Sequence, residues 1–347
     1  MKNQISRRRA LAAGAAATGL MMGTAPVRPE AGELAEVWGE DFLTPWSPPE
    51  KVKRDLTPGP SHIRLSCEAF RMRKAPGGSY ADQVRFTREA GYTACEAGAA
   101  AWDYSITDSE IREMRAALKQ HDVEFYTLHV WINIIDPDLE KRAKAHKLNC
   151  QAIEMADRLG MKFILTHAGG RNPLGKDSPH PLNWTRETWN MSVDAVKKIL
   201  KDTSGSTVDL GFEAVNSCNN NTPQSHVRLK KDVGDPRVKV TLDPSNMLHP
   251  GTFFRTSELI NQCFDLIGED IVYAHAKDQI WKDMMPTIVP ATLGTGSMDY
   301  ELFLARLSRL KRPRCLLLEH LPKEQYEPSK QFLLETAKRI GVKIYGV

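Results

Sequence analysis

The chain has 347 residues, of which 41% are hydrophobic and 26% are charged, a composition typical of globular proteins. Its formal net charge is +4, and Lys2 and the arginines at 7–9 account for that excess, so the rest of the chain is close to neutral. A near-neutral chain offers no electrostatic basis for binding nucleic acid or an anionic membrane surface.

Residues 1–25 are predicted to be a targeting peptide. The basic sequence Ser6-Arg7-Arg8-Arg9 is followed by an Ala/Gly-rich run ending at Met22, which is shorter than the roughly 20 apolar residues of a membrane span. The segment resembles a twin-arginine (Tat) signal, although Ala10 stands where such signals often carry Phe. The resemblance implies a periplasmic or otherwise exported protein with no membrane segment in its mature form. The alternative is a flexible basic tail.

Residues 26–61 contain seven prolines and little periodicity, which predicts a linker or an arm that wraps the surface. Residues 62–347 then form one predicted domain. The six cysteines are scattered without a Cys-x-x-Cys pair, which excludes a zinc knuckle or a small disulfide scaffold.

Short apolar runs alternate with amphipathic stretches along this domain. The runs, which predict strands, cover residues 63–67, 92–96, 124–129, 163–167, 208–213, 238–243, 271–275 and 315–319. Helical patterns between them include 79–90, 108–120, 139–159, 187–201, 256–267, 300–309 and 329–339. Eight strands alternating with helices predict an α/β fold, a single (β/α)8 TIM barrel. The alternative, an open doubly wound sheet, usually carries a Gly-rich turn after its first strand, and no such turn follows residue 67.

Seven of the eight apolar runs end in a side chain of a metal-ligand type. These residues are Glu96, His129, His167, Glu213, Asp243, His275 and Glu319. The carboxyl ends of all strands converge on one mouth of such a barrel, where active sites are built. Carboxylates gathered there would repel one another unless a cation joined them. The pattern therefore predicts a metal site at the mouth.

Five motifs give the chain a specific resemblance to a known family. They are Gly-Phe-Glu213-Ala-Val-Asn216, Leu-Asp243-Pro-Ser-Asn246, Ala-His275-Ala-Lys277-Asp278, Leu-Gly294-Thr-Gly296-Ser-Met-Asp299-Tyr and Leu-Leu-Glu319-His. From about residue 62 to the end, the chain resembles the xylose isomerase-like superfamily, in particular its sugar-phosphate isomerase/epimerase and ketose 3-epimerase branch.

The resemblance implies that Glu213, Asp243, His275 and Glu319 coordinate one divalent metal ion, and that Glu213 and Glu319 also act as an acid/base pair. Three carboxylates and one imidazole suit Mn, Mg or Co, with Zn as an alternative. Moving a proton next to a carbonyl needs an electrophile for the oxygens and a base on each face of the carbon, which such a site supplies.

Four further residues are candidates for binding substrate. His129 and His167 end the third and fourth runs, and each is either a substrate contact or a hydrogen-bonded structural histidine. Lys277 lies two residues after His275, so it faces the same side if the strand continues, where it holds an oxyanion or pairs with a carboxylate. Asn246 stands where ketohexose 3-epimerases carry a histidine.

The predicted function is a metal-dependent isomerase or epimerase that abstracts a proton next to the carbonyl of a free sugar or keto-sugar. A keto-glycoside lyase or hydratase would begin with the same step. A metallonuclease similar to apurinic endonucleases is a less favoured alternative, because Asn246 replaces one of its histidine ligands and no Asp-x-His pair follows His275. The predicted partner is a small sugar-like molecule rather than nucleic acid, and the sequence is compatible with a homo-oligomer.

Overall fold

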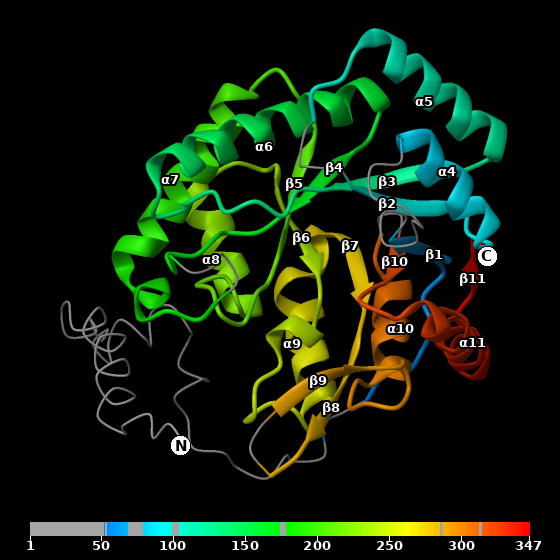
Figure 1. The fold of residues 1–347 in the computed structure, drawn as a ribbon. Helices are drawn as coiled ribbons and strands as arrows, with labels where there is room; N and C mark the ends of the chain where they lie inside the picture. The colour runs from blue at the N-terminus through cyan, green and yellow to red at the C-terminus, as the bar shows by residue number, and fades with distance from the viewer. Residues whose placement is uncertain are drawn as a thin grey trace, which may run out of the picture.

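The structure is a computed structural model that describes residues 52, 54–68, 79–98, 104–173, 178–284, 287–311 and 314–347 (Figure 1). The predicted targeting peptide and most of the predicted arm lie outside these residues. No helix in the described ranges is both long and apolar enough to cross a membrane.

Eight parallel strands close into a barrel, which confirms the predicted fold class. Each strand is hydrogen-bonded to the next in chain order, and the last pairs with the first, Leu65 lying opposite Leu316. The strands are β1 (Ile63–Glu68), β2 (Ala94–Gly98), β3 (Glu124–His129), β4 (Phe163–Thr166), β5 (Asp209–Glu213), β6 (Val238–Leu242), β7 (Ile271–Ala276) and β10 (Arg314–Leu318). A two-residue strand, β11 (Ile344–Tyr345), adds to β1.

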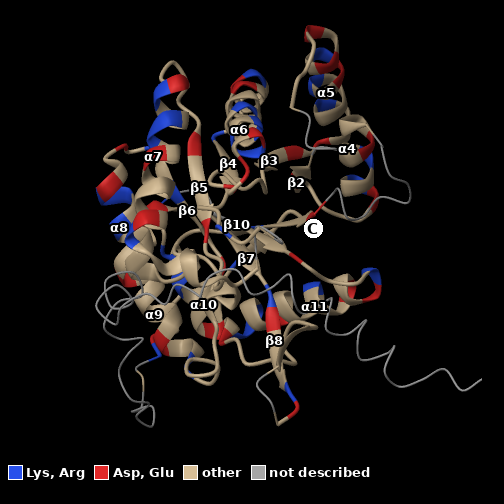
Figure 2. Cartoon of the chain, turned by 60° about the vertical axis from the view of Figure 1, so that its left-hand side comes forward, with Lys and Arg blue, Asp and Glu red and all other residues tan. Residues whose placement is uncertain are grey.

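Helices surround the barrel. They are α4 (Tyr80–Glu89), α5 (Asp108–His121), α6 (Leu139–Leu159), α7 (Arg186–Asp202), α8 (Pro223–Val233), α9 (Thr256–Ile267), α10 (Tyr300–Ser308) and α11 (Lys323–Ile340). Ser79, Thr107 and Thr222 begin helices with capping boxes, and Gly160 and Gly341 end them in the left-handed conformation that glycine adopts most easily. Acidic and basic residues are interspersed on the outer helices (Figure 2).

The interior of the barrel is filled by side chains. Phe163, Tyr273 and Leu317 belong to a buried cluster there, and Tyr126 stacks on Tyr273 with ring centroids 5.4 Å apart. The Tyr273 hydroxyl, which lies in this apolar layer, is hydrogen-bonded to Ser66 Oγ at 3.0 Å. Because the centre of the barrel is packed, chemistry is confined to its mouth.

A two-stranded antiparallel hairpin, β8 (Asp278–Lys282) and β9 (Thr287–Ala291), is inserted between β7 and α10. The sequence pattern did not predict it. The buried Asp278 carboxylate anchors the hairpin and accepts hydrogen bonds from four backbone N–H groups, those of Gln279, Gly294, Gly296 and Met298. The Gly294-Thr-Gly296 motif is therefore a loop folded around a carboxylate, consistent with a structural turn.

The described end of the predicted arm packs along α10. Arg54 forms ion pairs with Asp299 and Glu301, and the Gly59 amide donates to Ser308 Oγ at 2.8 Å. A side chain at Gly59 would overlap the Ser308 backbone, so the arm needs glycine at this close approach.

Candidate metal centre

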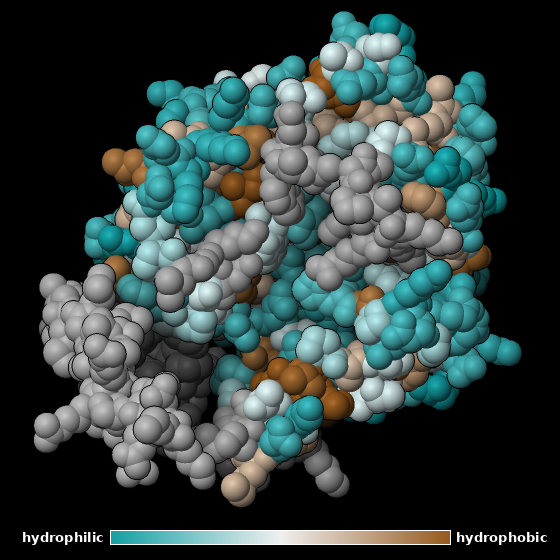
Figure 3. Space-filling view, viewed as in Figure 1, coloured by the Kyte–Doolittle hydropathy of each residue, from teal (hydrophilic) through white to brown (hydrophobic). Residues whose placement is uncertain are grey.

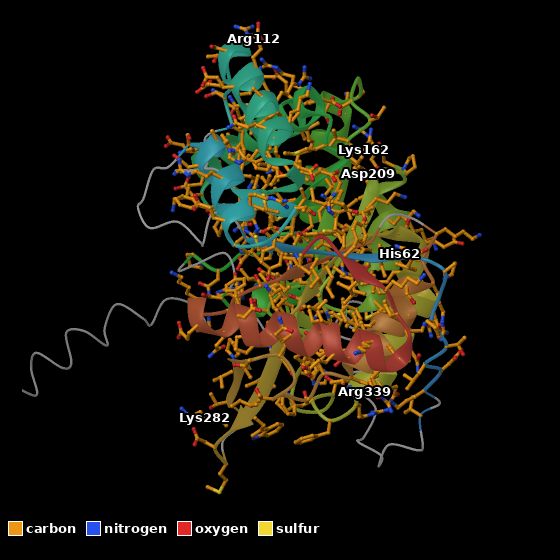
Figure 4. All side chains as sticks on the ribbon, turned by 90° about the vertical axis from the view of Figure 1, so that its right-hand side faces the viewer. His62, Arg112, Lys162, Asp209, Lys282 and Arg339 are labelled. Atoms are coloured by element: carbon orange, nitrogen blue, oxygen red, sulfur yellow. The ribbon has the colours of Figure 1, made fainter. Side chains whose placement is uncertain are left out.

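The carboxyl ends of the strands face one side of the molecule. In Figure 4, the labelled residues His62, Lys162 and Asp209 all lie toward the right-hand side. His62 precedes β1, Lys162 precedes β4 and Asp209 begins β5, so the strands start on this side and end on the other. The loops that follow the strands therefore form the mouth that faces away from these three residues.

The four predicted ligands converge at this mouth. Glu213 ends β5, Asp243 follows β6, His275 lies near the end of β7 and Glu319 follows β10. All four are buried, and each offers a ligand atom within 4.8 Å of the others. The barrel thus brings together residues that lie as far apart in the sequence as Glu213 and Glu319.

His275 Nδ1 lies at the centre of the group. It is 2.6 Å from Glu319 Oε2, 3.3 Å from Glu213 Oε1 and 3.7 Å from Asp243 Oδ2. Atoms that bind one ion at bond lengths of about 2.0–2.2 Å lie roughly 3 Å from one another. The three distances from His275 Nδ1 are close to that spacing.

Lys277 projects into the same cluster, as its two-residue spacing from His275 predicts. Its Nζ is 2.6 Å from Asp243 Oδ2, 2.8 Å from Glu319 Oε2 and 3.4 Å from Glu213 Oε1. Its backbone carbonyl is held by hydrogen bonds donated by Ser245 Oγ and the Tyr300 hydroxyl, both at 2.8 Å. The side chain pairs with carboxylates, and the predicted role in substrate binding stays a prediction.

The residues present fit a divalent cation. Three carboxylates and one ammonium leave two negative charges when His275 is neutral, and one divalent ion balances them. Asp243 Oδ2, Glu319 Oε2 and His275 Nδ1 are buried and lie at ion-pair distance from charged neighbours, yet none makes a well-oriented hydrogen bond within the described residues. Buried polar atoms that face one another in this way are atoms that a shared ion would satisfy.

Burial and the two basic groups shift the pKa values of the cluster in different directions. Burial outweighs Lys277 and His275 at Glu213 and raises the pKa of that carboxyl. At Asp243 burial is outweighed chiefly by the Lys277 ammonium, which lowers the pKa to about 2. At Glu319 burial is outweighed by His275 and Lys277, and the pKa lies well below its usual value.

Asn246 orients two of the ligands. Its Nδ2 donates to Glu213 Oε1 at 2.7 Å, while its backbone N–H and that of Ser245 donate to Asp243 Oδ1. One oxygen of each carboxylate is therefore fixed by the protein. Asn246 was predicted from the sequence to bind substrate, and the structure places it beside the centre as a partner of the ligands.

His129 and His167 lie on the β3 and β4 side of the mouth, with Trp131 beside them. Trp131 stacks on His167 with ring centroids 4.3 Å apart, and it is 5.7 Å from the His129 ring. His129 Nδ1 is 2.7 Å from Glu96 Oε1, and Glu96 Oε2 is 3.8 Å from His275 Nε2. Glu96 is therefore paired with His129 and lies near His275, but its Oε2 makes no hydrogen bond to the His275 imidazole within the described residues.

Glu68 and His320 also lie at the mouth and were not predicted from the sequence as site residues. Glu68 ends β1, and its Oε2 accepts hydrogen bonds from the His320 backbone N–H and the Tyr326 hydroxyl. His320 has a positive φ of 58°, is 41% exposed, and places Nε2 3.2 Å from Glu319 Oε1. The adjacent Glu319 and His320 in the sequence could have indicated this contact. The imidazole approaches the Glu319 carboxylate only because the backbone turns at His320.

The chain has relatives among known families and structures. A family model described as "Xylose isomerase-like TIM barrel" matches residues 84–336. A xylose isomerase domain protein from Planctomyces limnophilus is 15% identical with a TM-score of 0.61, and the alignment covers 81% of this chain and 99% of that chain.

Two further solved structures have the same fold. One is a xylose isomerase-like TIM barrel protein from Mycobacterium smegmatis in complex with magnesium, with 17% identity, a TM-score of 0.60, and coverage of 81% of this chain and 98% of that chain. The other is D-psicose 3-epimerase from Clostridium cellulolyticum H10 with D-tagatose, with 15% identity, a TM-score of 0.60, and coverage of 81% and 99%. No curated protein sequence matches the chain.

Proposed function

The chain belongs to the xylose isomerase-like TIM barrel family, and on that premise we propose that it is a metal-dependent sugar isomerase or epimerase. The observation that carries the proposal is the convergence of three buried carboxylates and one imidazole at the mouth of the barrel. The proposal is supported by the likeness to a structure of D-psicose 3-epimerase and to one in complex with magnesium.

Glu213, Asp243, His275 and Glu319 would hold the metal ion. When bound, a divalent ion supplies a Lewis acid for the carbonyl and hydroxyl oxygens of a sugar. The oxygen-rich ligand set favours Mn, Mg or Co, with Zn as the alternative.

Two glutamates would move the proton in this proposal. Glu213 Oε1 is held by Asn246, whereas its Oε2 makes no hydrogen bond to any described residue and is available to a proton. Glu319 Oε1 lies beside the imidazole of His320, which is a partner for a proton on that side. The two carboxylates come from β5 and from the end of β10, so they approach a substrate from different directions. One removes the proton from the carbon next to the carbonyl, and the other returns it.

The decisive experiment separates proton transfer from metal binding. Glu213→Gln and Glu319→Gln keep the size of the side chain and one ligating oxygen, so each should lower turnover by about 10²–10⁴-fold while much of the metal stays bound. Turnover is measured by NMR as conversion of candidate keto-sugars to product, and metal by elemental analysis of the same samples. Entry of solvent deuterium into the substrate is followed separately, and it should survive in the variant that keeps the proton-removing glutamate and vanish in the other. Asp243→Ala and His275→Ala should lose the metal itself.

Glu269→Gln is the matched control, because Glu269 is exposed and precedes β7 at the opposite end of the barrel. It should behave like the wild type in both assays. Near wild-type turnover in both active-site Gln variants, with metal in place, would exclude the proposed proton transfer. Full metal occupancy in Asp243→Ala and His275→Ala would exclude the ligand set.

A further inference from the structure

A pocket of about 330 Å³ opens between the N-terminal ends of α8 and α9. Small-molecule sites usually measure about 300–1,000 Å³, so the pocket is large enough for a ligand or part of one. Its walls come from the loops that follow β5 and β6 and include Asn216, Asn221, Met247, Arg255 and Leu259.

The pocket and the candidate metal centre are built from the same two loops, those that follow β5 and β6. Asn216 lies three residues after Glu213 on the same loop, and its Nδ2 reaches the Leu248 carbonyl of the neighbouring loop at 3.5 Å. Met247 directly follows Asn246, the residue that is hydrogen-bonded to Glu213. The pocket is therefore close in the chain to Glu213, where the proposed function places the reacting carbon of a substrate.

The polar groups of the pocket select a neutral ligand that carries hydroxyl groups. Asn221 is only 4% exposed, and its Oδ1 has no hydrogen-bond partner within the described residues. A buried acceptor left unpaired costs about 1–3 kcal/mol, so a change in the Asn221 side chain that turned this oxygen toward a ligand donor would be favourable. A ligand hydroxyl can donate a hydrogen bond to the oxygen of the Asn221 amide or accept one from its nitrogen. It therefore suits the amide whichever of these two atoms faces it.

The charges of the pocket are already paired. The Arg255 guanidinium contacts both oxygens of Glu258, at 2.5 and 2.7 Å. The N-terminus of α8 is capped by Thr222, whose hydroxyl accepts from the Ser225 amide. An anionic ligand would therefore have to displace existing partners, whereas a neutral polyol would not.

The walls include the apolar side chains of Met247 and Leu259, and an exposed aromatic residue lies next to the lining residues in the chain. Phe254, between the pocket residues Thr252 and Arg255, is 76% exposed and stacks on Trp281 with ring centroids 6.0 Å apart and an interplanar angle of 14°. Figure 3 shows apolar side chains gathered over the neighbouring β8–β9 hairpin, where Ile280 and Met284 are exposed. Flat exposed rings beside buried hydrogen-bonding groups are a suitable surface for the apolar face of a sugar.

We propose that this pocket is a subsite for a second, neutral sugar ring, so that the substrate is a keto-disaccharide or keto-glycoside rather than a free monosaccharide. The inference rests on the proposed function for the position of the reacting ring at Glu213 and Glu319. The pocket then holds the ring that does not react, through Asn221 and the aromatic rim.

The test compares sugars of one and two rings. Isothermal titration of the Mg²⁺-loaded full chain is carried out with sucrose, trehalose, lactose and cellobiose, and with their component hexoses. At least one disaccharide should bind tenfold or more tightly than either of its components. Asn221→Leu, which removes the acceptor, and Gln262→Trp, which fills the pocket from α9, should both abolish that preference without weakening hexose binding.

Leu266→Trp is the matched control, because Leu266 is an exposed residue of α9 outside the pocket. It should keep the disaccharide preference, and thermal unfolding checks that every variant is folded. The absence of any disaccharide preference across the panel, or an unchanged preference in Gln262→Trp, would overturn the subsite. If deuterium enters hexoses but no disaccharide binds more tightly than its components, the subsite alone is rejected. If a disaccharide binds preferentially but deuterium enters no keto-sugar, the proposed function alone is rejected.

Discussion

Lys277 places a positive charge among the carboxylates that are proposed to bind metal. Its Nζ lies within 3.4 Å of Glu213, Asp243 and Glu319. Two unit charges 4 Å apart interact by about 4 kcal/mol at an effective dielectric constant of 20, so this ammonium and a divalent ion oppose each other strongly. We therefore expect Lys277 to limit the affinity for a metal ion, while its charge offsets part of the negative charge of the three carboxylates when no ion is bound.

Replacing Lys277 by Met should increase the affinity for Mn²⁺ at least tenfold, as measured by titration calorimetry of chelator-treated protein. Tenfold corresponds to about 1.4 kcal/mol, a conservative part of the Coulomb term. Lys239→Met is the control, because Lys239 is also buried but pairs with Asp270. Unchanged or weaker binding by Lys277→Met would show that the ammonium does not compete with the ion.

The convergence of Glu213, Asp243, His275 and Glu319 could be predicted from the sequence because each closes an apolar run, and a barrel brings all run ends to one mouth. Lys277 followed from the two-residue period of a strand. The pairing of Glu96 with His129 and the approach of the His320 imidazole to Glu319 could not be predicted, because both depend on side-chain and loop conformation. Asn221 lies in a loop without periodicity, so its burial beside a pocket has no sequence signal.

Among the elements, the barrel strands were predicted within a few residues, whereas the β8–β9 hairpin was missed. Barrel strands are buried on both faces and therefore appear as continuous apolar runs. The hairpin strands Asp278–Lys282 and Thr287–Ala291 are half-exposed, and Pro290 weakens the strand signal of the second. What fixes this hairpin is the set of backbone hydrogen bonds to Asp278, which no hydrophobic pattern reveals.

Gly296 makes that hairpin anchor sensitive to substitution. A Cβ at Gly296 would overlap Asp278 Oδ1 and the Gln279 carbonyl oxygen. Gly296→Ala should therefore lower the free energy of unfolding by about 1–3 kcal/mol, as overpacking usually does. Gly205→Ala, where a Cβ meets no atom within 4 Å, should change it by less than about 0.5 kcal/mol. If urea unfolding gave the same free energy of unfolding for Gly296→Ala as for the wild type, the loop around Asp278 would be able to accommodate the extra methyl group without loss of stability.

At the scale of the whole molecule, export is a proposal that rests on the leader sequence alone. If Arg7 and Arg8 direct the chain to the Tat pathway, Arg7→Lys with Arg8→Lys should leave the precursor in the cytoplasm. Cell fractionation and immunoblotting measure the distribution, and the single variant Lys2→Arg is a control that preserves charge. Normal export of the double variant would mean that the arginines act only as a general positive region.

Stability of the whole fold should depend on pH through His226 on α8. This histidine is buried, its Nδ1 lies 3.4 Å from Asn220 Nδ2, and its Nε2 has no hydrogen-bond partner within the described residues. Burial lowers its pKa from an ordinary value of 6.5 to about 3. The unfolded chain therefore binds this proton more readily than the folded chain, and stability is lost as pH falls from about 6.5 toward 3.

Between pH 7 and pH 5 the linkage predicts a loss of about 2 kcal/mol from His226 alone. Urea unfolding is measured at both values in the presence of a chelator, since metal binding would add its own pH dependence. His226→Gln has no group to protonate, so its loss should be smaller than that of the wild type by about that amount. His62→Gln, at an exposed position before β1, should keep the wild-type dependence. The same pH dependence in His226→Gln as in the wild type would mean that His226 is protonated in the folded state at little cost, through a rearrangement that exposes its imidazole to water.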